Sequence, residues 1–87
     1  MNKVNKPKII VYSTKSCSFC HSLMHWLDEQ GVDYKEVDVE ASKSAEEDLL
    51  KLTDGRFVVP ITVVGEDVIE GFDRPGIRSS MLKHDII

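Results

Sequence analysis

Cysteine is scarce in this 87-residue chain, and neither a long apolar run nor an excess of basic residues is present. The two cysteines do not make up a four-ligand zinc site, because no second Cys-x-x-Cys occurs. No stretch approaches the roughly 20 apolar residues that a membrane-spanning helix needs. The formal net charge of −4 argues against nucleic-acid binding, which depends on clustered Lys and Arg. The cysteines therefore become the strongest chemical feature of the chain.

The composition is that of an ordinary globular protein, with 41% hydrophobic and 30% charged residues. Eighty-seven residues are enough to bury one core, so we expect residues 1–87 to form a single domain. The first eight residues are basic, but the apolar run after them, Ile9 to Tyr12, is too short for a signal-peptide core. We therefore expect a cytoplasmic protein, and in that compartment a dithiol is usually catalytic.

The two cysteines stand three positions apart, as Cys17-Ser18-Phe19-Cys20, where an apolar run gives way to a helical pattern. Ile9 to Tyr12 reads as a buried strand, and the apolar positions that follow have helical spacing. A Cys-x-x-Cys at a strand-to-helix junction is typical of a thioredoxin-like redox motif. The spacing therefore predicts a dithiol that exchanges with disulfides.

The position of Cys17 at a helix start favours the thiolate, which is the reactive form of cysteine. Lowering a thiol pKa by about two units requires about 2.7 kcal/mol. A helix dipole supplies only about 0.3–1 kcal/mol. Backbone N–H groups that donate to the sulfur, together with the charge of Lys15, are expected to provide the rest. Cys20 lies one turn further into the helix, so we predict that Cys17 attacks and Cys20 resolves the mixed disulfide.

Three other interpretations fit the same cysteines. A static disulfide closing so short a loop would remove little chain entropy. A metal site would need further ligands, and the nearest candidates, His21 and His25, share one helix face where solvated positions are the simpler explanation. Cys17 to His21 also spells the Cys-x-x-Cys-His motif of c-type haem attachment. A c-type cytochrome requires export and a largely helical chain, and the sequence indicates neither.

The rest of the pattern alternates between strands and helices. Strands are expected at 8–12, 32–39, 57–64 and 68–70, and helices at 18–30, at 42–54 and after Asp73. Ser44 and Glu47 match a capping box for the second helix, and Asp73 suits the N-cap of the last. The first strand, helix and strand predict a right-handed βαβ unit, and the turn at 65–67 predicts a hairpin.

Pro60 interrupts an otherwise continuous strand pattern. Proline lacks the N–H that a central ladder needs, so an edge position or a bulge would explain it. A cis Val59–Pro60 bond would instead turn the backbone N–H and C=O of Val59 outward beside the dithiol. An extended peptide would then pair with Val59 as an added strand.

Three motifs together resemble the glutaredoxin family and span nearly the whole chain. They are Tyr12-Ser13-Thr14-x-x-Cys17-Ser18-Phe19-Cys20, Gly55-Arg56-x-x-Val59-Pro60 and Gly71-x-Asp73. The resemblance implies an α/β thioredoxin fold, in which a four-stranded mixed sheet has helices on both faces and the order strand–helix–strand–helix–strand–strand–helix. It also implies a cis Pro60, no tightly bound cofactor, and a monomer that reduces disulfide-containing proteins with glutathione as reductant.

By the same resemblance, the residues around the dithiol bind glutathione. Val59 would pair with its cysteinyl backbone, and Asp73 with the N–H groups of the last helix would hold its γ-glutamyl end. Lys15 or Arg56 would meet its glycyl carboxylate. Phe19 and the two residues before Asp73, Gly71 and Phe72, complete the predicted substrate-binding set.

Five residues depart from the usual glutaredoxin pattern. Ser18 replaces a proline, Phe19 a common tyrosine, and Val58 a threonine. Phe57 occupies a site that is often basic. Phe72, within Gly71-Phe72-Asp73-Arg74-Pro75, resembles the small redoxins that serve ribonucleotide reductase and take electrons from thioredoxin reductase. Glutaredoxin-like proteins without the active-site proline also resemble iron–sulfur carriers, in which Cys17 and glutathione would be ligands. Both remain alternatives to a glutathione-reduced enzyme.

Overall fold

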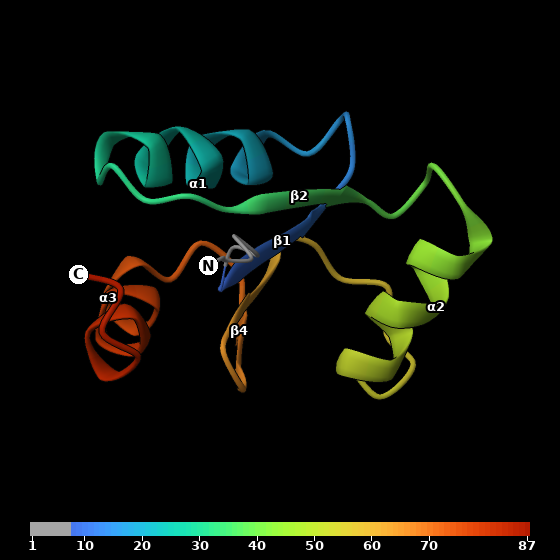
Figure 1. Ribbon diagram of the computed structural model, residues 1–87. Helices are drawn as coiled ribbons and strands as arrows, with labels where there is room; N and C mark the ends of the chain where they lie inside the picture. The colour runs from blue at the N-terminus through green and yellow to red at the C-terminus, as the bar shows by residue number, and fades with distance from the viewer. Residues whose placement is uncertain (1–7) are drawn as a thin grey trace, which may run out of the picture.

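The computed structural model describes residues 8–87 and shows one mixed sheet with helices packed on it (Figure 1). The elements in chain order are β1 (Ile9–Ser13), α1 (Ser18–Glu29), β2 (Lys35–Asp38), α2 (Lys43–Leu52), β3 (Ile61–Val64), β4 (Asp67–Glu70) and α3 (Arg74–Lys83). The strand order is β2-β1-β3-β4. β2 runs parallel to β1, whereas β3 and β4 form an antiparallel hairpin beside it. The predicted thioredoxin fold is confirmed.

The sheet separates two hydrophobic clusters. The larger one joins α1 and α3 to one face of the sheet, with Leu23, Leu27 and Ile77 fully buried. The smaller one joins Leu49 of α2 to Tyr12 and Ile61 on the other face. In Figure 1, α2 accordingly stands apart from α1 and α3. The chain passes from the carboxyl end of β1 into α1, which packs on one of these two faces.

Two predicted strands are longer than those observed. The segment 32–39 contributes only β2, because Val32 and Tyr34 pack against the larger cluster without pairing in the sheet. The segment 57–64 contributes only β3, which begins after Pro60. Since proline has no N–H to donate, the ladder starts at the next residue. The first strand was predicted one residue too early, and β4 begins at Asp67, which we had assigned to the turn.

The capping box predicted from Ser44 and Glu47 is wrong. Ser42 is the N-cap of α2, and its side chain accepts a hydrogen bond of 3.1 Å from the N–H of Ala45. Ser44 lies inside the first turn, where its own backbone is already helical. The serine two residues earlier has the extended backbone that an N-cap requires. The N-caps of α1 and α3 are Cys17 and Asp73, the residues that the sequence placed at these two helix starts.

Within residues 8–87, no helix is long and apolar enough to cross a membrane. The expectation that the basic start of the chain is not a signal peptide falls on residues 1–7, which lie outside the described residues, and stays a prediction.

Candidate active site

A disulfide joins Cys17 and Cys20 at the start of α1, with their Cα atoms 5.2 Å apart. Cys17 is the N-cap residue and has an extended backbone. Its sulfur accepts a hydrogen bond of 3.1 Å from the N–H of Cys20, which is one of the sulfur contacts expected from the sequence. Cys17 is partly exposed, whereas Cys20 is fully buried in the larger cluster. The two sulfurs therefore differ in their access to a partner.

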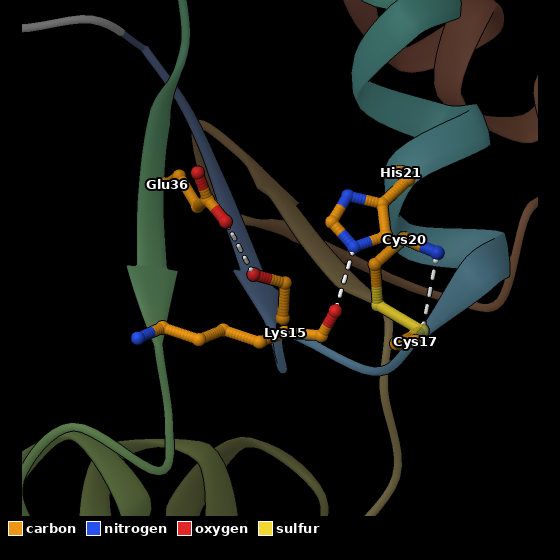
Figure 2. The surroundings of a disulfide bond; sticks show 6 residues. Lys15, Cys17, Cys20, His21 and Glu36 are labelled. Carbon is orange, nitrogen blue, oxygen red and sulfur yellow. Dashed lines mark hydrogen bonds between the residues drawn. A yellow bond between two sulfur atoms is a disulfide. The ribbon is translucent and has the colours of Figure 1, made fainter.

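The loop before the disulfide is held to α1 by three hydrogen bonds. The N–H of Cys17 donates to the carbonyl of Thr14 at 3.3 Å, and the carbonyl of Cys17 accepts from the N–H of His21 at 3.2 Å. The third joins the His21 ring, through Nε2, to the carbonyl of Lys15 at 2.8 Å. Figure 2 shows this ring reaching back beside the two cysteines. The sequence indicated His21 only as a solvated position, although its place four residues after Cys17 puts it on the first turn.

The end of β1 is tied to the neighbouring strand just before this loop. The hydroxyl of Ser13, which is fully buried, donates to Oε2 of Glu36 at 2.9 Å. The dashed line to Glu36 in Figure 2 marks this bond. Ser13 also pairs with Asp38 in the parallel ladder, so the residue from which the loop starts is fixed to β2.

The segment before β3 lies against the same cluster as Cys17. The Val59–Pro60 bond is cis, as the family resemblance implies. The carbonyl of Pro60 accepts a hydrogen bond of 2.9 Å from the N–H of Gly71, which fixes the segment to the end of β4. Within residues 8–87, neither the N–H nor the C=O of Val59 takes part in a backbone hydrogen bond. Within the described part of the chain, both backbone groups of Val59 are therefore without a backbone partner.

The guanidinium of Arg56 is engaged by Glu70. Its Nη1 and Nη2 atoms lie 2.9 and 3.4 Å from the two carboxylate oxygens, and its Nε donates to the carbonyl of Thr53. The hydrogen bond to Glu70 raises the pKa of Arg56 further above its ordinary value. A substrate carboxylate at Arg56 would have to compete with Glu70. The sequence singled out Arg56 and did not indicate its partner.

Phe72 packs beside the start of α3. Its ring meets that of Trp26 edge-on, with 6.4 Å between the centroids, and the guanidinium of Arg74 lies 5.5 Å above it. Asp73 caps α3, because its Oδ1 accepts from the N–H of Gly76 at 3.1 Å. Gly71 has a φ of +84°, a backbone conformation that favours glycine. Cys17, Val59 and Phe72 therefore all pack against the larger cluster, and Asp73 follows Phe72 in the chain.

Two predicted residues, Phe19 and Lys15, are exposed, and Figure 2 shows the Lys15 side chain extending toward β2, away from the disulfide. The Phe19 ring is 67% exposed, which is unusual for a large apolar side chain in the first turn of a helix. Lys15 is exposed, and its backbone carbonyl is held by His21.

No group of three or more His, Cys, Asp or Glu side chains within residues 8–87 is arranged to hold a metal ion. An iron–sulfur cluster shared between chains would need only Cys17 and glutathione from each side, so this arrangement does not test that alternative, which stays a prediction.

A family model described as Glutaredoxin matches residues 9–69 of the chain. The chain belongs to the glutaredoxin family. Glutaredoxin 1 of Rickettsia felis (strain ATCC VR-1525 / URRWXCal2) is 30% identical over 90 residues, covering 95% of this chain and 88% of that relative. N-acetyl-S-hydroxy-L-cysteine reductase of Bacillus subtilis (strain 168) is 33% identical over 71 residues, covering 80% and 75%.

A solved structure of this fold is the glutaredoxin-like protein NrdH-redoxin from Escherichia coli. It superposes with a TM-score of 0.72 and 24% identity, covering 82% of this chain and 91% of that one. At that identity the likeness establishes the fold alone. Family membership and the Cys17–Cys20 disulfide make this glutaredoxin a thiol–disulfide oxidoreductase.

Proposed function

We propose that the protein reduces protein disulfides and glutathione mixed disulfides, with Cys17 as the attacking sulfur and Cys20 as the resolving one. The observation that carries this proposal is the asymmetry at the start of α1. Cys17 is partly exposed and its sulfur accepts a backbone N–H, whereas Cys20 is buried. A thiolate at the N-terminus of a helix is favoured by unpaired N–H groups, and an accessible sulfur is the one a substrate reaches.

The reaction transfers two electrons from the dithiol to the substrate. The Cys17 thiolate attacks one sulfur of the substrate disulfide, forms a mixed disulfide and releases the other sulfur as a thiolate. Cys20 then loses its proton to solvent and attacks the Cys17 sulfur. The second substrate thiolate leaves, and the Cys17–Cys20 disulfide seen in the structure is the oxidised product.

An extended segment of substrate is proposed to pair with Val59. Its free N–H and C=O support this, since adding a strand to a backbone edge needs one donor and one acceptor. The exposed Phe19 and Lys15, together with Pro60, Gly71 and Phe72, are proposed to flank the bound segment. Asp73 would add its carboxylate at the start of α3.

Glutathione is our proposed reductant for the oxidised pair, and two glutathione molecules would leave as their disulfide. The unpaired backbone of Val59 supports this, because a small cysteinyl peptide can bind there. Thioredoxin reductase is the alternative electron source. We propose that one chain is the active species and that residues 1–87 act as one domain.

A cytoplasmic setting is also proposed, because a reducing compartment returns the disulfide to the dithiol after each turnover.

A coupled assay tests the electron source. The oxidised protein is given NADPH with glutathione and glutathione reductase in one reaction, and NADPH with thioredoxin reductase in another. We expect NADPH consumption in the first and little in the second. The reverse result would reject glutathione and leave the dithiol mechanism in place. No consumption in either reaction, with a Cys17→Ser variant as blank, would reject the proposed mechanism.

A second substrate class is supported by the Bacillus subtilis relative, whose name specifies reduction of N-acetyl-S-hydroxy-L-cysteine. That compound is a cysteine sulfenic acid. The Cys17 thiolate would attack its sulfur and displace hydroxide, which leaves as water, and Cys20 would then release the cysteine thiol. Adding this compound to the same coupled assay as electron acceptor is the test, and unchanged NADPH consumption would exclude it.

A further inference from the structure

We propose that His21 is a positioning residue, which fastens the loop before Cys17 to the first turn of α1 and so keeps the Cys17 sulfur at the helix N-terminus after the disulfide opens. This inference rests on the proposed role of Cys17 as the attacking sulfur.

The contact that carries the inference is the 2.8 Å hydrogen bond from His21 to Lys15. A carbonyl oxygen only accepts, so Nε2 of His21 must carry the proton in this bond. Side chains in a helix point back toward its N-terminus, which explains how a residue inside the first turn reaches the loop behind it (Figure 2). The bond therefore joins two backbone segments on either side of Cys17.

The disulfide and the His21 bond restrain the same loop, but only one of them survives reduction. In the oxidised protein, the sulfur of Cys17 is held covalently to the buried Cys20. When the two sulfurs separate, the Cys17 sulfur still has the N–H of Cys20 as a donor. The loop itself is held by the bond from Cys17 to Thr14, by the backbone bond from His21 to Cys17, and by the His21 ring. Among these three loop contacts, the ring is the one made by a side chain of α1. Losing it would let the Cys17 sulfur move away from the N–H groups that favour its thiolate.

Charged side chains also stand on the segments that neighbour the disulfide in the fold. The loop contributes Lys15, and β2 contributes Glu36, which accepts from Ser13. At the start of α3, Asp73 accepts from Gly76 and Arg74 lies over Phe72. The segment at Val58, Val59 and Pro60 contributes apolar side chains. His21 is thus the titratable side chain bonded directly to the loop.

The experiment compares His21→Ala with two further variants. His21→Gln retains a nitrogen that donates at a similar reach and should restore the bond to Lys15. His25→Ala is the matched control, because His25 is exposed on the same helix one turn later and lies 3.5 Å from Glu29, away from the loop. Thermal unfolding of the oxidised forms checks that all three variants fold.

At neutral pH, we expect His21→Ala to lower the second-order rate of disulfide reduction about two- to tenfold, the change that one hydrogen bond accounts for. The thiolate fraction of reduced Cys17, followed by its ultraviolet absorbance, should fall with the rate. Near pH 10, above the ordinary thiol pKa of about 8.5, both proteins are ionised and the rates should converge. His21→Gln should recover most of the neutral-pH rate, and His25→Ala should match the unsubstituted protein.

Two results would overturn the inference. An unchanged rate and thiolate fraction in His21→Ala would show that the ring does not act on Cys17. A deficit of equal size at neutral pH and near pH 10 would indicate a purely structural contribution. Failure of the proposed function is a separate result, since it would appear as residual activity in Cys17→Ser irrespective of His21.

Discussion

At the scale of single residues, the two cysteines of one short motif differ in burial. The sulfur of Cys17 faces the first turn of α1 from the outside, and that of Cys20 lies within the larger cluster. A substrate disulfide can reach the first without unfolding the helix, whereas Cys20 is fully buried. This difference supports the proposed order of attack and resolution.

Replacing each cysteine by serine should separate the two steps. Cys17→Ser should reduce disulfides no faster than the uncatalysed reaction, because a hydroxyl does not replace the thiolate. Cys20→Ser should accumulate a mixed disulfide on Cys17, visible by mass spectrometry, and keep part of its activity toward glutathionylated substrates. Activity retained by Cys17→Ser would contradict its role, and complete loss in Cys20→Ser would argue against glutathione.

At the scale of the elements, the three helices begin in the same way. The side chains of Cys17, Ser42 and Asp73 each accept a hydrogen bond from the N–H three residues later. Such a cap satisfies one of the N–H groups that a helix start leaves without a partner. In α2 and α3 the acceptor is oxygen. In α1 the acceptor is the Cys17 sulfur, so the cap and the proposed attacking group are one atom.

The N-cap of α2 offers a direct test of this pattern. Ser42→Ala should lower the free energy of unfolding by about 1 kcal/mol, since the N–H of Ala45 loses its partner. For a domain of this size, that change lowers the melting temperature by about 4–8 °C. Ser44→Ala is the matched control and should leave the melting temperature nearly unchanged, because Ser44 is already helical. An equal loss in both variants would contradict the assignment.

At the scale of the whole molecule, a polar contact joins the edge of the sheet to the last helix. The carboxylate of Asp67, at the start of β4, accepts from the hydroxyl of Ser80 at 2.6 Å and from Nζ of Lys83 at 3.2 Å. Nε2 of His84 lies 3.4 Å from Oδ2 of the same carboxylate. The hydrogen bond from Ser80 is the main cause that lowers the pKa of Asp67 below its ordinary value of 3.8, and Lys83 adds to it. The ionised carboxylate thus helps to hold α3 against the hairpin.

Acidification should weaken this contact. A carboxyl whose pKa is lower in the folded protein than in the unfolded chain stabilises the fold above the ordinary value, near pH 3.8, and this contribution disappears as the pH falls through the folded value. The difference in unfolding free energy between the unsubstituted protein and Asp67→Asn should therefore be full near pH 6 and shrink below about pH 4. Glu66→Gln, an exposed neighbour, serves as control. A difference that stays constant with pH would contradict this role.

The sequence by itself determined the order of the elements and the position of the dithiol, because both depend on local properties. Hydrophobic periodicity identifies α1, and a Cys-x-x-Cys between a strand and that helix indicates redox chemistry from neighbouring residues alone. Pro60 was likewise recognised as exceptional, since a proline in a strand conflicts with the ladder whatever surrounds it. The strand ends and the cap of α2 were less well predicted, because several nearby residues satisfied the same local rules.

Only the tertiary structure decided which distant residues meet. Glu70 accepts a hydrogen bond from Arg56, Trp26 packs edge-on against Phe72, and Ser80 donates a hydrogen bond to Asp67. Each of these pairs is separated by more than ten positions, and its contact exists because the sheet and helices bring two segments together. Periodicity describes which face of an element is buried, but not what it is buried against. For that reason the chemistry of the dithiol was evident from the sequence, whereas the partners of the groups around it were not.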